Sequence, residues 1–290
     1  PSDHPYAEAN LAYAERLVKF LLWQKGGHRV YVGGDPAIGT YVQRCYGTPG
    51  VPGTPGVPGP EGSRAFDFDF MQRIYEHPFK VLSCRPEEVP PEHENSKAIG
   101  RHLEGCRIGF DLGASDRKVS AVIDGETVYS EEVIWEPRKH ADPEYHYREL
   151  RAAIDAAAAH LPRVDAIGGS SAGVIINNRP MIASLFRGVP AKRYAAIHEI
   201  FRHIGAELGV PIEVANDGDV TALAGAMSLE DSAVLGIALG SSEASGYVNA
   251  EGKITGWLNE LAFAPVDYNP QAVVEEWSGD RGVGASYFSQ

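Results

Sequence analysis

The sequence has few of the features that mark disulfide-rich, zinc-binding or membrane-spanning proteins. Only three of its 290 residues are cysteines (Cys45, Cys84 and Cys106), and no Cys-x-x-C pair occurs. Neither a disulfide framework nor a cysteine-rich zinc site is therefore indicated. The longest apolar run, near residues 17–23, contains Lys19 and is far shorter than the ~20 residues that span a bilayer. We expect a protein of the reducing cytoplasm that has no membrane partner.

Positive charge is also scarce. The formal net charge is −13, so the average surface would repel a polyanion, and we do not expect a nucleic-acid partner.

The apolar content of 43% and the length of 290 residues allow two lobes, each with its own core.

The first 104 residues form one segment of mixed character. Apolar spacing predicts a helix over residues 5–25, and a β-rich run follows at residues 28–32. The tract from Gly47 to Gly62 repeats Gly in every third position over five triplets, and we interpret it as a polyproline-type surface loop. We expect residues 1–104 to form an N-terminal α/β extension.

From Cys106 onward the pattern alternates between strands and helices, which predicts an α/β protein. The expected strands are residues 107–110, 119–123, 127–134, 164–167, 212–215 and 233–239. One expected helix begins at the Asp142-Pro143 cap. Two more are expected over residues 191–208, where Gly209 ends the helix, and over residues 220–227.

Three motifs could carry chemistry. In the first, residues 108–118, a strand delivers Asp111, and Gly113 permits a turn whose backbone N–H groups can approach phosphate, with Ser115 and Lys118 as further donors. An ordinary hairpin is the alternative interpretation of this motif.

In the second motif, residues 214–226, a strand end places Asn216 beside Asp217, and a helix of small residues follows. Asp217 could accept a proton from a bound hydroxyl group, which Asn216 could orient. The alternative is that Asp217 or Asp219 only caps the helix.

The third motif, residues 235–248, is a strand, a turn rich in Gly and Ser, and a return strand. Gly240, Ser241 and Ser242 could form a second phosphate clamp, and a plain hairpin is again the alternative.

Together the motifs resemble the ROK family of sugar kinases and sugar-responsive repressors, over about residues 106–280. The Asp111 turn resembles the family's D-x-G-G-T, Asn216-Asp217 its N-D-A-N, and the segment from Gly240 its G-T-G-x-G-G-G. The segment Ser170 to Asn178 resembles the family's sugar-site loop.

The resemblance implies an actin-like, two-lobed, ribonuclease H-like fold. The N-terminal extension (1–104) would precede a first lobe (105–215) and an incomplete second lobe (216–290), because the family's adenine-binding segment would follow Gln290.

The resemblance also implies that ATP, with Mg²⁺ as cofactor, phosphorylates a hydroxyl group of a hexose or amino sugar. Asp217 would be the general base, and Asp111 would position Mg²⁺ through water. The resemblance assigns five sugar contacts: Ser171, Gly173, Asn178, Asn216 and Glu260.

The sequence departs from the family pattern at several positions. Glu243 stands where the second clamp should have glycine, and Phe263 where many members have histidine. The cysteine-rich zinc loop is missing, so we expect no structural zinc.

The sequence also allows two other functions. One is a non-catalytic sugar-sensing regulator, although the first 104 residues contain 11 Lys and Arg against 13 Asp and Glu and show no second recognition helix. The other is an ATPase of the chaperone or actin kind. The oligomeric state is open too, a homodimer included.

Overall fold

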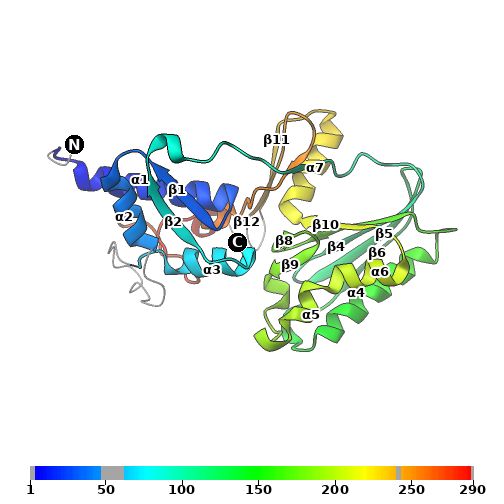
Figure 1. Cartoon of the computed structure of the whole chain (residues 1–290). Helices are drawn as coiled ribbons and strands as arrows, with labels where there is room; N and C mark the ends of the chain where they lie inside the picture. Colours follow the sequence, from blue (N-terminus) through cyan, green and yellow to red (C-terminus); the bar gives the residue numbers. More distant parts are fainter. Residues whose placement is uncertain (1–3, 47–61, 240–242, 289–290) are drawn as a thin grey trace. The chain divides into compact units, whose positions relative to one another are not determined.

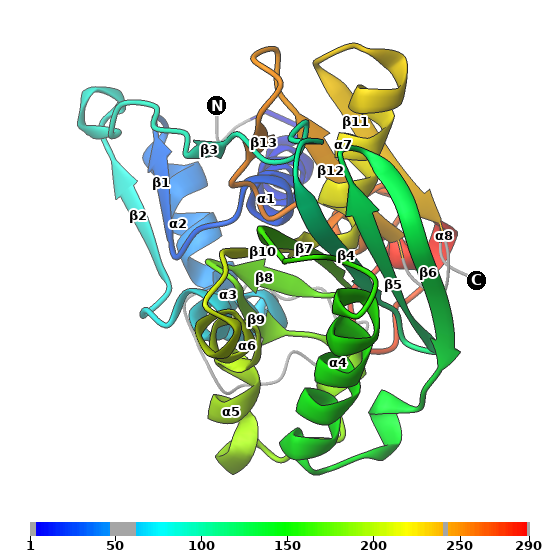
Figure 2. The ribbon, with the colours of Figure 1, turned by 90° about the vertical axis from the view of Figure 1, so that its right-hand side faces the viewer.

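The computed structural model describes residues 4–46, 62–239 and 243–288. The glycine- and proline-rich loop expected before Gly62 and the Gly240–Ser242 turn lie outside these residues. The chain forms two compact units (Figure 1), and the strands of the larger sheet can be followed in Figure 2. Unit 1 comprises residues 1–97, 237–245 and 255–290, and unit 2 comprises residues 98–236 and 246–254. The lobe boundaries expected from the sequence stay a prediction.

Unit 2 is built around a five-stranded mixed sheet. Its order is β10-β7-β4-β5-β6, where β4 is Cys106–Leu112, β5 is Asp116–Ile123, β6 is Glu126–Ile134, β7 is Ala166–Ser171 and β10 is Ile212–Asn216. β4, β5 and β6 form an antiparallel meander, whereas β7 and β10 run parallel to β4. This order and these directions are those of the ribonuclease H-like sheet of actin-like proteins, so the expected fold class is confirmed.

Helices cover this sheet and supply its core. α4 (Pro143–Ala158), α5 (Tyr194–His198) and α6 (Ile200–Leu208) lie together in Figure 1, with α7 (Asp217–Leu229) on the other side of β10. The core contains the inward-facing residues of β4 (Ile108, Phe110, Leu112) together with residues of α4 and α6. Because side chains alternate along a strand, Asp111 faces away from this core.

The remaining elements of unit 2 are short. They are β8 (Val174–Ile176), β9 (Arg179–Ile182) and the 3-10 turns Pro137–Lys139, Ser184–Phe186 and Ala191–Arg193. The chain passes between the units within β11 (Val234–Leu239), β12 (Glu243–Val248) and β13 (Ile254–Thr255), which belong to a sheet of order β11-β12-β13-β3.

Local sequence signals explain the ends of several elements. The Asp142 side chain accepts a hydrogen bond from the Glu144 N–H at the start of α4, as the Asp-Pro pair predicts. Gly209 ends α6 with φ of 66°, a conformation that glycine adopts without strain. The single helix expected over residues 191–208 is wrong, because the structure breaks it at Glu199 into α5 and α6.

In unit 1, helices connect two parallel strands. β1 (Arg29–Gly33) pairs with β2 (Lys80–Cys84), and α2 (Pro36–Tyr46) and α3 (Ala65–Tyr75) lie between them in the chain. α1 (Ala7–Lys25) confirms the helix predicted at the start of the sequence. The short elements of this unit are Pro86–Glu88, β3 (Ser96–Lys97), Leu261–Phe263 and α8 (Ala285–Phe288). The α/β character expected for the N-terminal segment is thus present.

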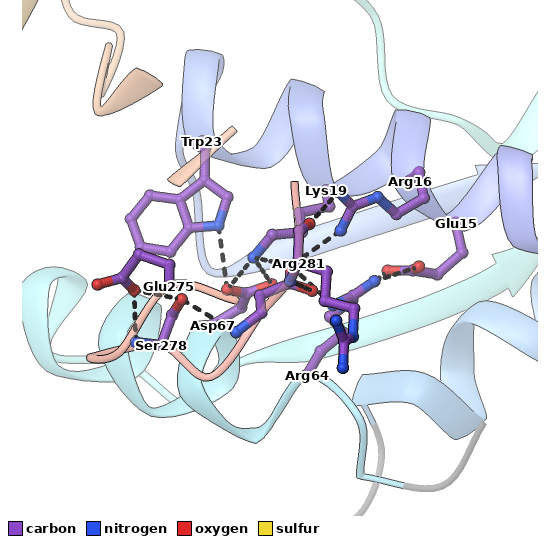
Figure 3. A network of polar contacts seen from close by, with 10 residues as sticks. Glu15, Arg16, Lys19, Trp23, Arg64, Asp67, Glu275, Ser278 and Arg281 are labelled. Carbon is purple, nitrogen blue, oxygen red and sulfur yellow. Dashed lines mark hydrogen bonds and ion pairs between the residues drawn. The ribbon is translucent and has the colours of Figure 1, made fainter. Parts of the chain in front are cut away.

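A buried network of opposite charges holds α1, α3 and the C-terminal segment of unit 1 together (Figure 3). The Lys19 ammonium lies 2.6 Å from Oδ1 of Asp67, and both side chains are 1% exposed. Oδ2 of Asp280 lies 2.9 Å from Nη1 of Arg16 and 2.9 Å from Nη1 of Arg64. Such charges are tolerated in a protein interior because each has an opposite partner.

The described helices include none long and apolar enough to cross a membrane.

We predict that Asp67→Asn lowers the free energy of unfolding by about 3–5 kcal/mol, because removing one partner of a buried ion pair leaves the other charge poorly compensated. Urea unfolding followed by tryptophan fluorescence measures this. The control is Glu87→Gln, which removes a surface ion pair whose two side chains are 71% and 65% exposed and should change stability by less than about 0.5 kcal/mol. Equal effects of the two substitutions would contradict a stabilising role for the network.

Candidate functional site

The candidate site lies where three parallel strands of unit 2 end. The strand register aligns Asp111 of β4 with Ser170 of β7, and Ser170 with Ala215 of β10. One residue further on, Leu112 is aligned with Ser171 and Ser171 with Asn216. The Asp111 motif, the start of the Ser170–Asn178 loop and the Asn216-Asp217 pair therefore meet at one edge of the sheet. In open α/β sheets, ligands bind at the carboxyl ends of strands.

Asp111 leads into a tight turn between β4 and β5. The Gly113 N–H donates to the Asp116 carbonyl oxygen at 3.0 Å, which closes the hairpin. A Cβ atom at Gly113 would lie only 3.1 Å from that oxygen, so the close approach favours glycine. The backbone N–H groups of Ala114 and Ser115 make no hydrogen bond to the residues that the structure describes. The donors available at this turn are thus those of Ala114 and Ser115, and the N–H of Gly113 is already used.

Lys118 lies opposite Asp111 on the neighbouring strand. Its Nζ lies 3.1 Å from Asp116 Oδ1 and 4.0 Å from Asp111 Oδ2, and it is half exposed. The hydrogen bond to Asp116 raises the pKa of Lys118, and burial opposes this effect. Ser115 Oγ donates to the other oxygen of Asp116 at 2.9 Å. A bound anion would therefore compete with Asp116 for the donors of Lys118 and Ser115.

Asn216 caps helix α7, which begins at Asp217. Its Oδ1 accepts from the Gly218 N–H at 2.7 Å, and its Nδ2 donates to the Gly173 carbonyl oxygen at 2.8 Å. The alternative in which Asp217 or Asp219 caps the helix is wrong, since Asn216 takes this place. These two bonds engage both ends of the Asn216 amide, and its contact with a substrate stays a prediction.

Asp217 combines partial burial with a second carboxylate nearby. Burial raises the pKa of Asp217, and the negative charge of Asp111 raises it further. Hydrogen bonds from the backbone N–H groups of Asp217 and Gly218 and from the Asn216 side chain act in the opposite direction. Because the folded-state pKa lies above the unfolded one, this carboxyl contributes stability at low pH that is lost as the pH rises through its folded pKa. Asp217 is thus a stronger base than an ordinary aspartate.

The Ser170–Asn178 loop contributes structure to this edge. Ser171 is fully buried, and its Oγ donates weakly to the Ala172 carbonyl oxygen at 3.4 Å. Gly173 has φ of 100°, and a Cβ there would lie 2.5 Å from the Cβ of Ala183, so no other residue fits without strain. These two contacts fix the loop, and the expected sugar contacts of Ser171 and Gly173 stay predictions.

Asn178 binds the backbone of β10. Its Nδ2 donates to the Ile212 carbonyl oxygen at 3.0 Å, and its Oδ1 accepts from the Val214 N–H at 2.7 Å. These two bonds tie the turn after β8 to the backbone of β10. Its expected role in binding sugar also stays a prediction.

Of the remaining candidates, Glu260 lies in unit 1, and Gly240, Ser241 and Ser242 lie outside the described residues. The Glu260 N–H donates to the Trp23 carbonyl oxygen at 3.1 Å, so this segment is fixed to the end of α1. The Phe263 ring lies 4.7 Å, centroid to centroid, from the Trp23 ring in an aromatic cluster. Phe263 therefore takes part in the packing of unit 1. The sugar contact of Glu260 and the second phosphate clamp stay predictions.

Glu243 is buried within unit 1. A Cβ at Gly284 would lie 2.5 Å from Glu243 Oε2, and burial raises the pKa of this carboxyl. This buried carboxyl is therefore less readily ionised than an exposed glutamate.

The donor set at the edge in unit 2 fits a nucleotide–magnesium pair in part. Asp111 is 41% exposed and faces a second carboxylate, an arrangement that favours a hard cation bound through water. The N–H groups of Ala114 and Ser115 suit phosphate oxygens. Over the described residues, no group of three or more His, Cys, Asp or Glu side chains gathers to hold a metal by itself. A magnesium ion here would thus keep most of its water or phosphate ligands.

Comparisons with known proteins give structural matches only. No family model and no curated protein matches the sequence. Among solved structures, the chain is similar to a ROK hexokinase from Thermus thermophilus (19% identity, TM-score 0.48, 62% of this chain and 58% of that one). It is also similar to an inorganic polyphosphate/ATP-glucomannokinase from Arthrobacter sp. strain KM (24%, 0.45, 57% and 65%).

A ROK family transcriptional regulator, a homolog of the E. coli MLC protein, matches as well (18%, 0.47, 64% of this chain and 47% of that one). The chain thus matches structures of ROK sugar kinases and of a ROK regulator alike, and it spans about half to two thirds of their length.

One residue that the sequence motifs miss is Trp135, directly after β6. Its indole Nε1–H donates to the Gly113 carbonyl oxygen at 3.0 Å. A tryptophan 22 residues after the glycine carries no local signal of this contact. Only the antiparallel pairing of β5 with β6, which aligns Asp116 with Ile134, brings the two together.

We predict that Asp111→Asn lowers the pKa of Asp217, because it removes a nearby negative charge that disfavours ionisation. Carboxyl-carbon NMR titration of Asp217 in both proteins measures the shift. Asp124→Asn, in the β5–β6 turn of the same unit, is the control and should leave the pKa of Asp217 unchanged. An unaltered pKa in the Asp111 variant would mean that the two carboxylates do not share a site.

Proposed function

We propose that this chain carries the catalytic edge of an ATP-dependent sugar kinase, which phosphorylates a hydroxyl group of a hexose or an amino sugar. The observation that carries the proposal is the alignment of the Asp111 turn and the Asp217 carboxylate at one edge of the actin-like sheet. A phosphate-binding turn and a base beside it are the two parts that phosphoryl transfer to a hydroxyl needs.

The two parts divide the work as follows. Phosphate oxygens would be bound by the N–H groups of Ala114 and Ser115 and by Lys118. These donors would stabilise the negative charge of the phosphate. Asp111 would hold Mg²⁺ through water, and the ion supplies charge neutralisation of the phosphates when bound. Asp217 would accept the proton of the attacking hydroxyl at a carboxylate oxygen. Its raised pKa brings it closer to neutral pH, where a general base is most effective.

A sugar and a nucleotide are the partners that this proposal requires. The pairing of a base with nearby polar groups suits a polyhydroxyl substrate, and the resemblance in sequence motifs narrows it to hexoses and amino sugars. The three cysteines are free thiols in the structure, which agrees with a cytoplasmic setting.

A screen for ADP release tests the proposal. The protein is incubated with Mg-ATP and a panel of hexoses and amino sugars, and a gel shift with genomic DNA fragments runs in parallel. Sugar-dependent ADP release supports the kinase. Retained DNA without ADP release would instead favour a sugar-sensing regulator. Absence of both ADP release and DNA retention would refute the kinase proposal.

We predict that Asp217→Asn lowers kcat about 10²- to 10⁴-fold, because the amide keeps the shape of the carboxylate but cannot accept the proton. Sugar affinity, measured by calorimetry, should stay near that of the unmodified protein. Asp231→Asn, just after the other end of α7, is the matched control and should keep full activity. Normal turnover in the Asp217 variant would remove this residue from the mechanism.

A further inference from the structure

Trp135 lies beneath the turn that carries the proposed phosphate donors. It follows β6 directly, and the residue is 4% exposed. The ring is stacked with Tyr145 at a centroid distance of 6.4 Å and meets the edge of His146 at 6.2 Å. Both partners belong to the first turns of α4. Tertiary packing therefore fixes the orientation of the indole.

Two hydrogen bonds join this tryptophan to the turn. Its indole N–H donates to the Gly113 carbonyl oxygen at 3.0 Å, and its backbone N–H donates to the Ser115 carbonyl oxygen at 3.1 Å. Trp135 thus holds the carbonyl groups of both Gly113 and Ser115, the residues before and after Ala114. A two-residue turn with both of these groups fixed has little freedom left.

Peptide geometry turns this constraint into a direction for the donors. In a trans peptide the C=O and N–H bonds point in opposite directions. Because the Gly113 carbonyl points at the indole, the N–H of Ala114, which belongs to the same peptide, points away from it. That N–H has no partner among the residues described. The indole therefore sets the direction of an unused donor.

We propose that Trp135 is a positioning residue, whose indole N–H orients the Gly113–Ala114 peptide so that the Ala114 N–H can bind a phosphate oxygen of a nucleotide. The inference rests on the proposed kinase function and adds a residue outside the sequence motifs. Trp135 would act through the turn and would not touch the ligand itself.

The size of the effect follows from one neutral hydrogen bond. Such a bond contributes about 0.5–1.5 kcal/mol, which corresponds to roughly a 2- to 10-fold change in an equilibrium constant. Loss of the bond frees the Gly113–Ala114 peptide to rotate, so the affinity for the nucleotide should decrease. Sugar binding and proton transfer at Asp217 do not depend on this peptide.

The test compares Trp135→Phe with Trp257→Phe. Trp257 also donates an indole hydrogen bond, to Glu94 at 3.0 Å in unit 1, so the control loses the same kind of bond elsewhere. We predict that Trp135→Phe raises the Kd and the KM for Mg-ATP about 2- to 10-fold, with the sugar KM unchanged and kcat within about twofold. The Trp257 variant should bind Mg-ATP like the unmodified protein.

A second variant guards against a simple packing defect. Replacement of Trp135 by 3-benzothienylalanine keeps the ring size and removes only the N–H donor, and it should weaken Mg-ATP binding as Phe does. Normal Mg-ATP binding by this variant overturns the positioning role and leaves the proposed function intact. Absence of Mg-ATP binding in the unmodified protein would overturn both proposals.

Discussion

The parallel pairing of β7 with β4 on one side and with β10 on the other is the constraint on which the site depends. It places the ends of the three strands at the same edge, although Asp111 and Asp217 are 106 positions apart in the sequence. The register is fixed because β4 buries alternate residues in the core, and a shift by one position would turn Asp111 inward. The hydrophobic pattern of one strand thus determines where the polar groups lie.

At this edge, adjacent side chains have different tasks. Asn216 uses its amide to start α7 and to hold the Gly173 carbonyl, whereas Asp217 stays next to Asp111. Asn178 and Gly173 fix the loop that follows β7. Asn216, Asn178 and Gly173 therefore build this edge, and Asp217 is the residue that we propose as the general base.

Much of unit 2 could be predicted from the sequence, because its signals are local. The Asp142 cap, the Gly209 stop and the β4–β5–β6 meander follow from short-range patterns. The break at Glu199 could not, since the apolar spacing continues across it. The Lys19–Asp67 pair and the Trp135–Gly113 bond were equally hidden, because each joins residues far apart in the chain. Of the candidate site, the residues at the strand ends were predicted, and the tasks of Asn216 and Asn178 were not.

The most direct test of the account uses Mn²⁺-ATP as a paramagnetic probe in NMR. We expect it to broaden the amide signals of Ala114, Ser171 and Gly218 together, because the three strand ends would surround one nucleotide–metal site. Signals of Arg107, Ala166 and Ile212, about 15–20 Å away at the opposite ends of the same strands, should broaden much less. Broadening at the opposite ends, or at only one of the three sites, would contradict a single phosphate and acid–base site at this edge.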